Sequence, residues 1–338
     1  MIKEAIEKAG RGQSLSRQEA KRLFDGIMSG KVGTDELADF LKALAEKGES
    51  VEEIVGAAES MRSAAAAVKP KVKADLLDIV GTGGDKKNTI NVSTAAAFVA
   101  AGAGCIVAKH GNRSVSSKCG SADVLEKLGV KIDLDHEQNA RLIEKIGIAF
   151  LFAPCHHPAM KHAMPARKKL GIRTIFNILG PITNPAGAQT YLLGVFDPGL
   201  AEKLAQVLAG LNTKHALVVH GNDGFDEISL SAATTVFEVQ GRKVKKYEVA
   251  PEQFGFKRCR EEEVAAETVE ENAEILKNIL AGKQKGPKAG IVLLNAGAAI
   301  YANNKAASIA EGIEKAKKSI SSGKALKKLE QLIEESRR

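Results

Sequence analysis

From residue 74 onward, short apolar runs alternate with segments of helical periodicity. The runs are typical of buried strands and cover residues 76–80, 105–108, 148–152, 191–195, 216–220 and 290–294. Helical patterns separate most of them, at residues 93–103, 121–128, 136–146 and 200–211. Such alternation predicts a mainly parallel sheet covered by helices. A β-hairpin is expected at 234–240 and 243–249, and two helices, about 306–321 and 324–338, close the chain.

The first 68 residues contain helical patterns only. Ser16 with Glu19 and Ser50 with Glu53 match the capping-box pattern, and Thr34 is expected to cap a third helix. Segment 156–184 breaks the later alternation because it is helical, basic and interrupted by prolines. We therefore expect an α/β protein with a small helical domain and a larger domain around a central, mainly parallel sheet. The helical domain would comprise 1–68 joined by about 156–184, and the α/β domain 74–155 and 185–338.

Composition and charge exclude several classes of protein. Aromatic residues are only 4% of the chain and Trp is absent, which disfavours an all-β sandwich. The longest apolar stretch, 95–108, is too short to span a bilayer, and the first residues lack the apolar core of a signal peptide. The four cysteines form no C-x-x-C pair, so a reduced cytoplasmic compartment is expected rather than a zinc or disulfide framework. The net charge of +8 fits a solvated basic face or a phosphorylated substrate; no basic run is interleaved with aromatics, so a nucleic-acid partner is not expected.

Two loops rich in glycine and hydroxyl groups follow the first two apolar runs. The first reads GTGGD at 81–85 and NTINVST at 88–94, and the second reads KHGNRSVSSKCGSADVLEKLG at 109–129. Loops of this kind present backbone N–H groups, hydroxyls and a helix N-terminus to an anion. Two such loops on successive strand–helix units predict a ligand with two phosphate groups at different places. A GTGGD sequence alone is equally consistent with a tight turn.

Charged residues near these loops suggest further roles. Lys109 offers a point charge for a phosphate. Its neighbour His110 is a candidate general acid, or simply a hydrogen-bonding residue at a strand end. Asp226 and Glu227 follow the strand at 216–220, where adjacent carboxylates suit Mg²⁺ bound to a diphosphate; a surface acid pair is the alternative.

Segment 156–184 carries cations that could bind a carboxylate. The guanidinium of Arg167 can grip a planar carboxylate with two hydrogen bonds. On charge alone Lys168, Lys169 and Arg173 are equally eligible. The sequence lacks convincing nucleophile-elbow, Walker A, dinucleotide-binding and zinc-protease motifs, so hydrolase, ATPase and redox functions have no support.

The ordered set of motifs resembles the anthranilate phosphoribosyltransferase family of tryptophan biosynthesis. The set comprises GTGGD, NVST, the whole 109–129 loop, residues 156–187 and GFDEIS, and the resemblance covers essentially the whole chain. It implies a nucleoside-phosphorylase-like phosphoribosyltransferase fold with a hinge between two domains. It also implies a cytoplasmic homodimer formed through the helical domains. The implied reaction joins phosphoribosyl pyrophosphate (PRPP) to the amine of anthranilate by displacement at the ribose C1, the second step from chorismate to tryptophan.

The same resemblance implies a set of ligand-binding residues. For PRPP the implied residues are Gly81, Gly84, Asp85, Thr89, Asn91, Val92, Ser93, Thr94, Lys109, Ser117 and Ser121. For anthranilate they are Gly81, Asn112 and Arg167, and for a pair of Mg²⁺ ions per monomer they are Ser93, Asp226 and Glu227. No general base is assigned, although His110 is a candidate. Two departures from the family pattern stand out, namely Lys86-Lys87 after GTGGD and Phe225 before the acid pair.

Two other functions remain open at this point. A pyrimidine nucleoside phosphorylase resembles this fold and binds a single phosphate, so it would need neither NVST nor the acid pair. A non-catalytic relative could instead use its basic surface to bind nucleic acid, with strong salt dependence.

Overall fold

A helical bundle forms the N-terminal part of the molecule. The computed structural model describes residues 1–85, 87–114 and 119–338. The bundle consists of α1 (Ile2–Gly10), α2 (Arg17–Met28), α3 (Thr34–Lys47) and α4 (Val51–Ser63). The capping boxes at Ser16 and Ser50 are confirmed. The expectation for Thr34 is wrong by one position, because Gly33 is the N-cap and Thr34 is the first helical residue.

A seven-stranded sheet forms the centre of the larger part, in the order β3-β2-β1-β4-β5-β6-β7. The strands are β1 (Leu76–Gly81), β2 (Ile106–Gly111), β3 (Ile148–Phe152), β4 (Thr190–Gly194), β5 (His215–Gly221), β6 (Thr234–Gln240) and β7 (Lys243–Val249). β1 to β5 are parallel, and β6 and β7 add an antiparallel hairpin at one edge. The expected fold class and hairpin are therefore confirmed. Strands β4 and β5 are buried along their whole length, as their continuous apolar runs predict.

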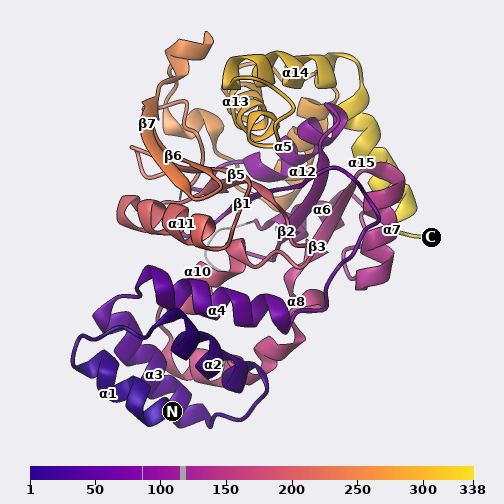
Figure 1. Ribbon diagram of the computed structural model, residues 1–338. Coiled ribbons are helices and arrows are strands. Elements are labelled where there is room, and N and C mark those ends of the chain that lie inside the picture. The colour runs from indigo at the N-terminus through magenta and orange to yellow at the C-terminus, as the bar shows by residue number, and fades with distance from the viewer. Residues whose placement is uncertain (86, 115–118) are drawn as a thin grey trace.

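Helices cover both faces of the sheet (Figure 1). They are α5 (Val92–Gly102), α6 (Ser121–Lys127), α7 (His136–Ile146), α11 (Pro198–Gly210), α12 (Val269–Leu280), α13 (Pro287–Ala302), α14 (Ile309–Ser321) and α15 (Lys324–Glu335), with 3₁₀ turns η2 (Pro251–Phe254) and η3 (Glu261–Val264). α5 and α13 lie on one face, and α11 lies on the other, where it also contacts α4. Among the described residues, no helix has both the length and the apolar character needed to cross a bilayer.

One expected strand is wrong. Residues 290–294 lie inside α13, which runs from Pro287 to Ala302 and is buried along most of its length. A short apolar run does not distinguish a buried strand from a buried helix, and the neighbouring alanines favour the helix. Pro287 stands at the first helical turn, where its missing N–H costs no hydrogen bond.

The segment that breaks the alternation packs against the bundle. It contains α8 (Ala153–His156), η1 (Pro158–His162), α9 (Met164–Leu170) and α10 (Ile175–Ile182). η1 contacts α2, α9 contacts α3, and α10 contacts α3 and α4. The guanidinium of Arg62 on α4 donates to the Ile182 carbonyl at 2.6 and 3.0 Å. The division of the chain at residues 68, 156 and 184 remains a prediction.

Segments that run between the bundle and the sheet are bonded to one another. The N–H of Ala66 donates to the carbonyl of His156 at 2.8 Å. Two residues later, the N–H of Val68 donates to the carbonyl of Pro185 at 3.0 Å. The outgoing chain after α4 therefore lies between the segment that leaves the sheet after β3 and the segment that returns to it before β4.

Candidate active site

The predicted loops meet where the chain order of the strands reverses. β1 pairs with β2 on one side and with β4 on the other, and all three strands are parallel. Their carboxyl ends therefore lie at one edge of the sheet. In open α/β sheets, ligands bind in the crevice at such a switch point. The GTGGD loop after β1 and the second loop after β2 both begin there.

Two glycines make room for Asp226 at this edge. Gly81 at the end of β1 pairs in register with Gly194 at the end of β4. A Cβ on Gly194 would lie 1.6 Å from the Asp226 carbonyl oxygen, and one on Gly81 would lie 2.4 Å from Asp226 Oδ2. The N–H of Gly83 donates to the same Oδ2 at 2.8 Å. The turn after β5 therefore lies directly on the ends of β1 and β4.

Three carboxyl groups gather around this turn. Burial and the nearby charge of Asp85 raise the pKa of Asp226, and burial together with Asp226 raises the pKa of Glu227 well above its usual range. Asp85, whose pKa burial also raises, lies within hydrogen-bonding reach of Asp226. The Oδ2 atom of Asp85 is buried and has no hydrogen-bond partner among the described residues. Ionising all three groups would therefore require a compensating positive charge, because burial and mutual repulsion favour their neutral forms.

Lys109 and Ser93 lie close to these carboxyl groups. The ammonium of Lys109, which is buried, donates to the Ile79 carbonyl at 2.6 Å and to Ser93 Oγ at 3.2 Å. Burial lowers the pKa of Lys109, and the charges of Asp78, Glu227 and Asp226 oppose that shift. The Glu227 carboxylate accepts a hydrogen bond from the Ser93 backbone. The three predicted magnesium ligands, Ser93, Asp226 and Glu227, are thus brought to one place.

This donor set fits a magnesium ion in part. Uncompensated carboxylates and a hydroxyl are the hard oxygen ligands that Mg²⁺ prefers. Among the described residues, however, no group of three or more His, Cys, Asp or Glu side chains is arranged to hold a metal ion alone. Mg²⁺ usually keeps several ligands from water or substrate phosphates, so an incomplete protein shell suits it better than it suits zinc.

The second loop is joined to the first. Asn91 donates from Nδ2 to the Cys119 carbonyl at 3.4 Å, and the Cys119 thiol donates to Asn91 Oδ1 at 3.3 Å. The Ser121 hydroxyl donates to the Asn112 carbonyl at 3.2 Å. Predicted residues of the two loops are therefore linked by hydrogen bonds, and Ser117 falls outside the described residues.

Three other residues predicted to bind PRPP lie at the start of α5 and in the stretch just before it. Val92 is the first residue of α5, and Thr94 is buried with a hydroxyl that has no partner among the described residues. Thr89 forms an isolated bridge with Ala265. The first turn of α5 thus holds a hydroxyl without a partner among the described residues, at a helix N-terminus of the kind that favours an anion. Gly84 within the GTGGD loop has a φ of +89°, which glycine adopts readily and which lets this loop turn back.

Arg167 lies on α9 with its charge uncompensated. Its guanidinium carbon is 5.7 Å from the centre of the Phe176 ring, and burial lowers its pKa. No carboxylate pairs with it among the described residues, whereas Lys169 forms a 2.8 Å ion pair with Asp35. Four cations are equally eligible to bind a ligand carboxylate, and Lys169 among them is already paired with Asp35. Arg173 lies over the Phe196 ring at 4.7 Å, against Gly84 of the first loop.

His110 is a buried, neutral histidine. Burial and the proximity of His157 hold its pKa well below the usual range. Its Nδ1 lies 3.1 Å from the Gly180 carbonyl, so that nitrogen carries the proton and donates. The other nitrogen, Nε2, has no partner among the described residues. A neutral ring with a free acceptor nitrogen suits the candidate role of proton acceptor better than that of general acid, and both roles remain predictions.

Sequence reasoning missed the residues that hold His110. Asp78 accepts the His110 backbone N–H at 3.1 Å and the side-chain amide of Asn184 at 2.8 Å. The ring of His157 lies 5.1 Å from that of His110. Asp78 was detectable in the sequence, because a carboxylate within an apolar strand needs buried partners. Nothing in the sequence pointed from Asn184 to its partner 106 positions away.

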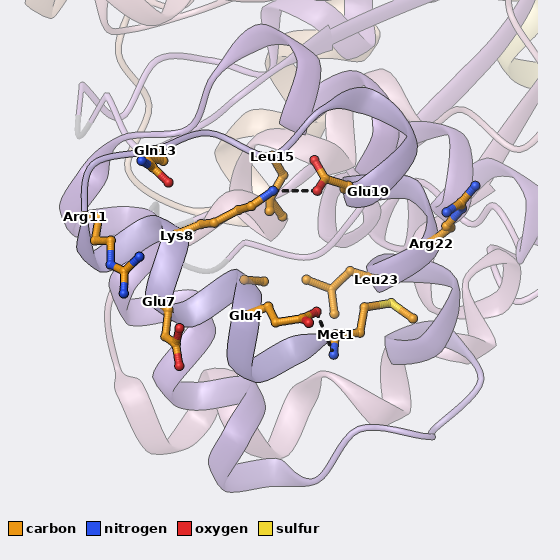
Figure 2. Close-up of a pocket in the computed structure, with 11 residues that line it drawn as sticks. Met1, Glu4, Glu7, Lys8, Arg11, Gln13, Leu15, Glu19, Arg22 and Leu23 are labelled. Carbon is orange, nitrogen blue, oxygen red and sulfur yellow. Dashed lines mark hydrogen bonds and ion pairs between the residues drawn. The ribbon is translucent and has the colours of Figure 1, made fainter.

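A cavity of about 530 Å³ lies elsewhere, between α1 and α2 of the bundle. Two ion pairs lie in its lining: Lys8 contacts Glu19 at 2.6 Å, and the N-terminal amine of Met1 contacts Glu4 at 3.1 Å (Figure 2). None of the predicted site residues lines it. The cavity is therefore separate from the cluster of predicted residues at the sheet edge.

Comparison with known proteins agrees with this geometry. Residues 73–326 match a family model described as the a/b domain of a glycosyl transferase family, and residues 3–65 match that family's helical bundle domain. The anthranilate phosphoribosyltransferase of Rubrobacter xylanophilus is 50% identical over 338 residues, which are 100% of this chain and 98% of the relative. The chain belongs to the anthranilate phosphoribosyltransferase family.

Solved members of the anthranilate phosphoribosyltransferase family share the fold. The enzyme from Thermus thermophilus superposes with a TM-score of 0.93 at 44% identity, covering 99% of both chains. The Saccharomyces cerevisiae enzyme in complex with PRPP and Mg gives a TM-score of 0.91 at 31% identity, covering 99% of this chain and 98% of that one. A complex of the same yeast enzyme with 4-fluoroanthranilate gives 0.89 at 30% identity, covering 99% and 97%.

Proposed function

We propose that this protein transfers the phosphoribosyl group of PRPP to the amine of anthranilate, which gives N-(5-phosphoribosyl)anthranilate and pyrophosphate. The observation that carries the proposal is the placement of Asp226 and Glu227. The turn that holds them lies on Gly81 and Gly194 at the switch point, facing Asp85, Ser93 and Lys109. A doubly phosphorylated sugar is a ligand that needs such a combination of N–H groups, hydroxyls, a cation and metal-binding carboxylates.

The donor would lie across the two loops. The GTGGD loop and the start of α5 would bind its phosphates, with Lys109 as the buried cation. A solved structure of the yeast enzyme contains PRPP and Mg, which supports the same ligands here. Ser117 lies outside the described residues, so its part rests on the sequence resemblance alone.

Magnesium would be held by Ser93, Asp226 and Glu227, and a pair of ions per monomer is our proposal. A bound Mg²⁺ would stabilise the negative charge of a departing diphosphate. Asp85 adds a further buried carboxylate oxygen without a partner among the described residues. Because burial favours the neutral form of these acids, a divalent cation would also hold them ionised.

The acceptor would be oriented by Arg167 and Asn112. A half-buried guanidinium without a carboxylate partner among the described residues is suited to the anthranilate carboxylate, which it can bind through two hydrogen bonds. The yeast enzyme in complex with 4-fluoroanthranilate supports an aromatic carboxylate as acceptor. With the acceptor held there, its amine would point toward the ribose carbon that loses pyrophosphate.

Positioning and charge stabilisation would account for most of the catalysis. Correct orientation of two reactants can contribute about 7–11 kcal/mol. The loop N–H groups and Lys109 would stabilise the charge that develops on pyrophosphate. The attacking aryl amine is neutral and becomes acidic only as the bond forms, so no strong base is required. His110, with its free Nε2, is the proposed proton acceptor if one acts.

We also propose a cytoplasmic homodimer formed through the helical bundle. Three large apolar side chains are exposed on the bundle and on the segment that packs against it, Met1 at 69%, Met164 at 49% and Ile172 at 49%. Burying these side chains between two subunits would remove apolar surface from water, which supports an interface on this part of the molecule. All four cysteines, which lie within the described residues, are free thiols, as a reducing compartment favours.

The proposed reaction is tested by mixing anthranilate, PRPP and Mg²⁺ with the protein. We expect loss of anthranilate fluorescence together with release of pyrophosphate in equal amount. Consumption of inorganic phosphate with uridine or thymidine, and no loss of anthranilate, would favour the nucleoside phosphorylase instead. Oligonucleotide binding without any turnover would favour the non-catalytic alternative.

A further inference from the structure

Lys87 makes two interactions at the outer end of the GTGGD loop. Its ammonium forms an ion pair with Glu261 at 2.8 Å, and the two side chains are 25% and 41% exposed. The same nitrogen lies 5.3 Å from the centre of the Phe225 ring, within the range of a cation–π interaction. Phe225 is fully buried and directly precedes Asp226. The two departures from the family pattern therefore contact each other.

The backbone around Lys87 also connects the GTGGD loop to the Phe225–Asp226 turn and to the segment that holds Glu261. The Lys87 N–H donates to Asp85 Oδ1 at 3.3 Å. Immediately after it, the Ile90 N–H donates to the Val264 carbonyl and the Ala266 N–H donates to the Asn88 carbonyl, both at 3.0 Å. The loop is thus paired with η3 and the residues that follow it. Closer to β1, the loop is held by the Gly83 bond to Asp226 and by a bond from the Thr82 N–H to the Gly194 carbonyl.

We propose that Lys87 is a positioning residue for donor binding. Its side chain ties the GTGGD loop to the Phe225–Asp226 turn on one side and to Glu261 on the other. A loop that is already ordered loses less conformational entropy when a ligand binds, so affinity is higher without any new contact to the ligand. The inference rests on the proposed function, because it assumes that the loop and turn bind the donor.

A direct contact between Lys87 and a donor phosphate is the competing explanation. The two explanations predict opposite effects at Glu261. If Glu261 orders the loop through Lys87, removing the carboxylate weakens donor binding. If Glu261 competes with the donor for the ammonium, removing it strengthens donor binding or leaves it unchanged.

The test is a double-mutant cycle with Lys87→Met and Glu261→Gln, in which KM for PRPP, KM for anthranilate and kcat are measured. We expect each single variant to raise KM for PRPP about 3- to 10-fold, and the double variant to resemble either single one. KM for anthranilate and kcat should stay within about twofold of the parent. Lys87→Arg should restore the parent value, and Phe225→Leu should give a smaller rise in the same direction.

Lys145→Met and Glu335→Gln provide the matched control. Lys145 and Glu335 form an ion pair of 2.6 Å between α7 and α15, near the start of β3 and not at the carboxyl ends of the strands where the loops lie. These variants should leave KM for PRPP unchanged. A lower KM for PRPP in Glu261→Gln, an equal rise in both KM values, or the same rise in the control pair would each overturn the inference.

A second readout does not depend on turnover. In the ligand-free protein, Lys87→Met and Glu261→Gln should speed amide hydrogen exchange at residues 82–85 and leave exchange in β1 unchanged. Unchanged exchange in the loop would overturn the inference. If the parent protein releases no pyrophosphate from PRPP and anthranilate, the proposed function fails, whereas normal turnover with unaffected Lys87 variants refutes only the role of Lys87.

Discussion

Asp78 on β1 holds the backbone of His110 on β2 through a hydrogen bond of 3.1 Å. A side chain on β1 thus accepts a hydrogen bond from the backbone of the neighbouring strand, and Asp78 is completely buried. Its second oxygen accepts the Asn184 amide at 2.8 Å, and that amide also donates to the Ala108 carbonyl at 2.7 Å. The end of β2 is thereby fixed to β1 and to the segment before β4.

Asp78→Ala should be strongly destabilising. It leaves buried N–H groups of His110 and Asn184 without their acceptor, and we expect a loss of about 3–5 kcal/mol in the free energy of unfolding. Asp78→Asn keeps an acceptor oxygen and should lose less. Urea denaturation followed by circular dichroism measures both, and equal stability of the alanine variant and the parent would contradict the role of Asp78.

Gly194→Ala should displace the turn that carries Asp226. The added Cβ would lie 1.6 Å from a backbone oxygen, which cannot move without shifting the whole turn. We expect a loss of about 3 kcal/mol in stability and a large loss of activity. Gly10→Ala is the control, because a Cβ there has nothing within 4 Å. If the two variants unfold at the same urea concentration, the close contact between Gly194 and the Asp226 carbonyl is contradicted.

Arg167→Ala should raise KM for anthranilate about 10- to 100-fold and leave KM for PRPP nearly unchanged. The reason is that the guanidinium would contact only the acceptor carboxylate. Steady-state kinetics with each substrate varied in turn measures the effect. Lys168→Ala, at the neighbouring position on α9, serves as control. Equal rises in both KM values would reject a specific contact with the acceptor.

Asp226→Asn and Glu227→Gln should weaken the dependence of the rate on magnesium. Each change removes a charged oxygen ligand, and the Mg²⁺ concentration at half-maximal rate should rise about 10-fold or more. Initial rates over a magnesium titration measure the shift. Glu202→Gln on the exposed side of α11 is the control. An unchanged titration in both site variants would remove these residues from the metal site.

Stability should fall in acid through Glu238, far from the active site. His215, Tyr301 and Gln240 donate hydrogen bonds to this carboxylate, with the His215 bond as the main cause that lowers its pKa to about 2. Because the pKa is lower in the folded than in the unfolded protein, the stabilisation is complete above about pH 4.5 and disappears as the pH falls toward 2.

The contribution of Glu238 should be about 2–3 kcal/mol at neutral pH. Glu238→Gln should therefore be less stable than the parent at pH 7, and the difference should shrink below about pH 4.5 and nearly vanish only at about pH 2. Urea unfolding at a series of pH values tests the prediction. A constant difference between variant and parent across this range would show that the charge of Glu238 is not responsible.

Sequence patterns predict helices and strands well where the deciding contacts join residues that are close in the sequence. The Ser16–Glu19 capping box depends on residues three positions apart, and the structure has it as expected. The strand expected at residues 290–294 is wrong because an apolar run has no periodicity that separates a buried helix from a buried strand. The segment that packs on the bundle is recognisable only because its prolines and basic residues interrupt the alternation.

The active site was predictable in its parts and not in its contacts. Glycines, hydroxyls and the Asp226–Glu227 pair carry recognisable chemistry, and parallel strands bring their ends together. The burial that raises the pKa of Asp226 depends on Gly194, which lies on another strand, and local patterns do not report such a partner. The same holds for Asp78 with Asn184 and for Lys87 with Glu261 and Phe225.

The bonds from Ala66 to His156 and from Val68 to Pro185 join three passages of chain between the bundle and the sheet. A single connecting segment would let the bundle swing in any direction. Three segments joined side by side by hydrogen bonds should bend more easily about one axis than they twist. We therefore expect any movement that brings Arg167 toward the GTGGD loop to follow that single bending axis.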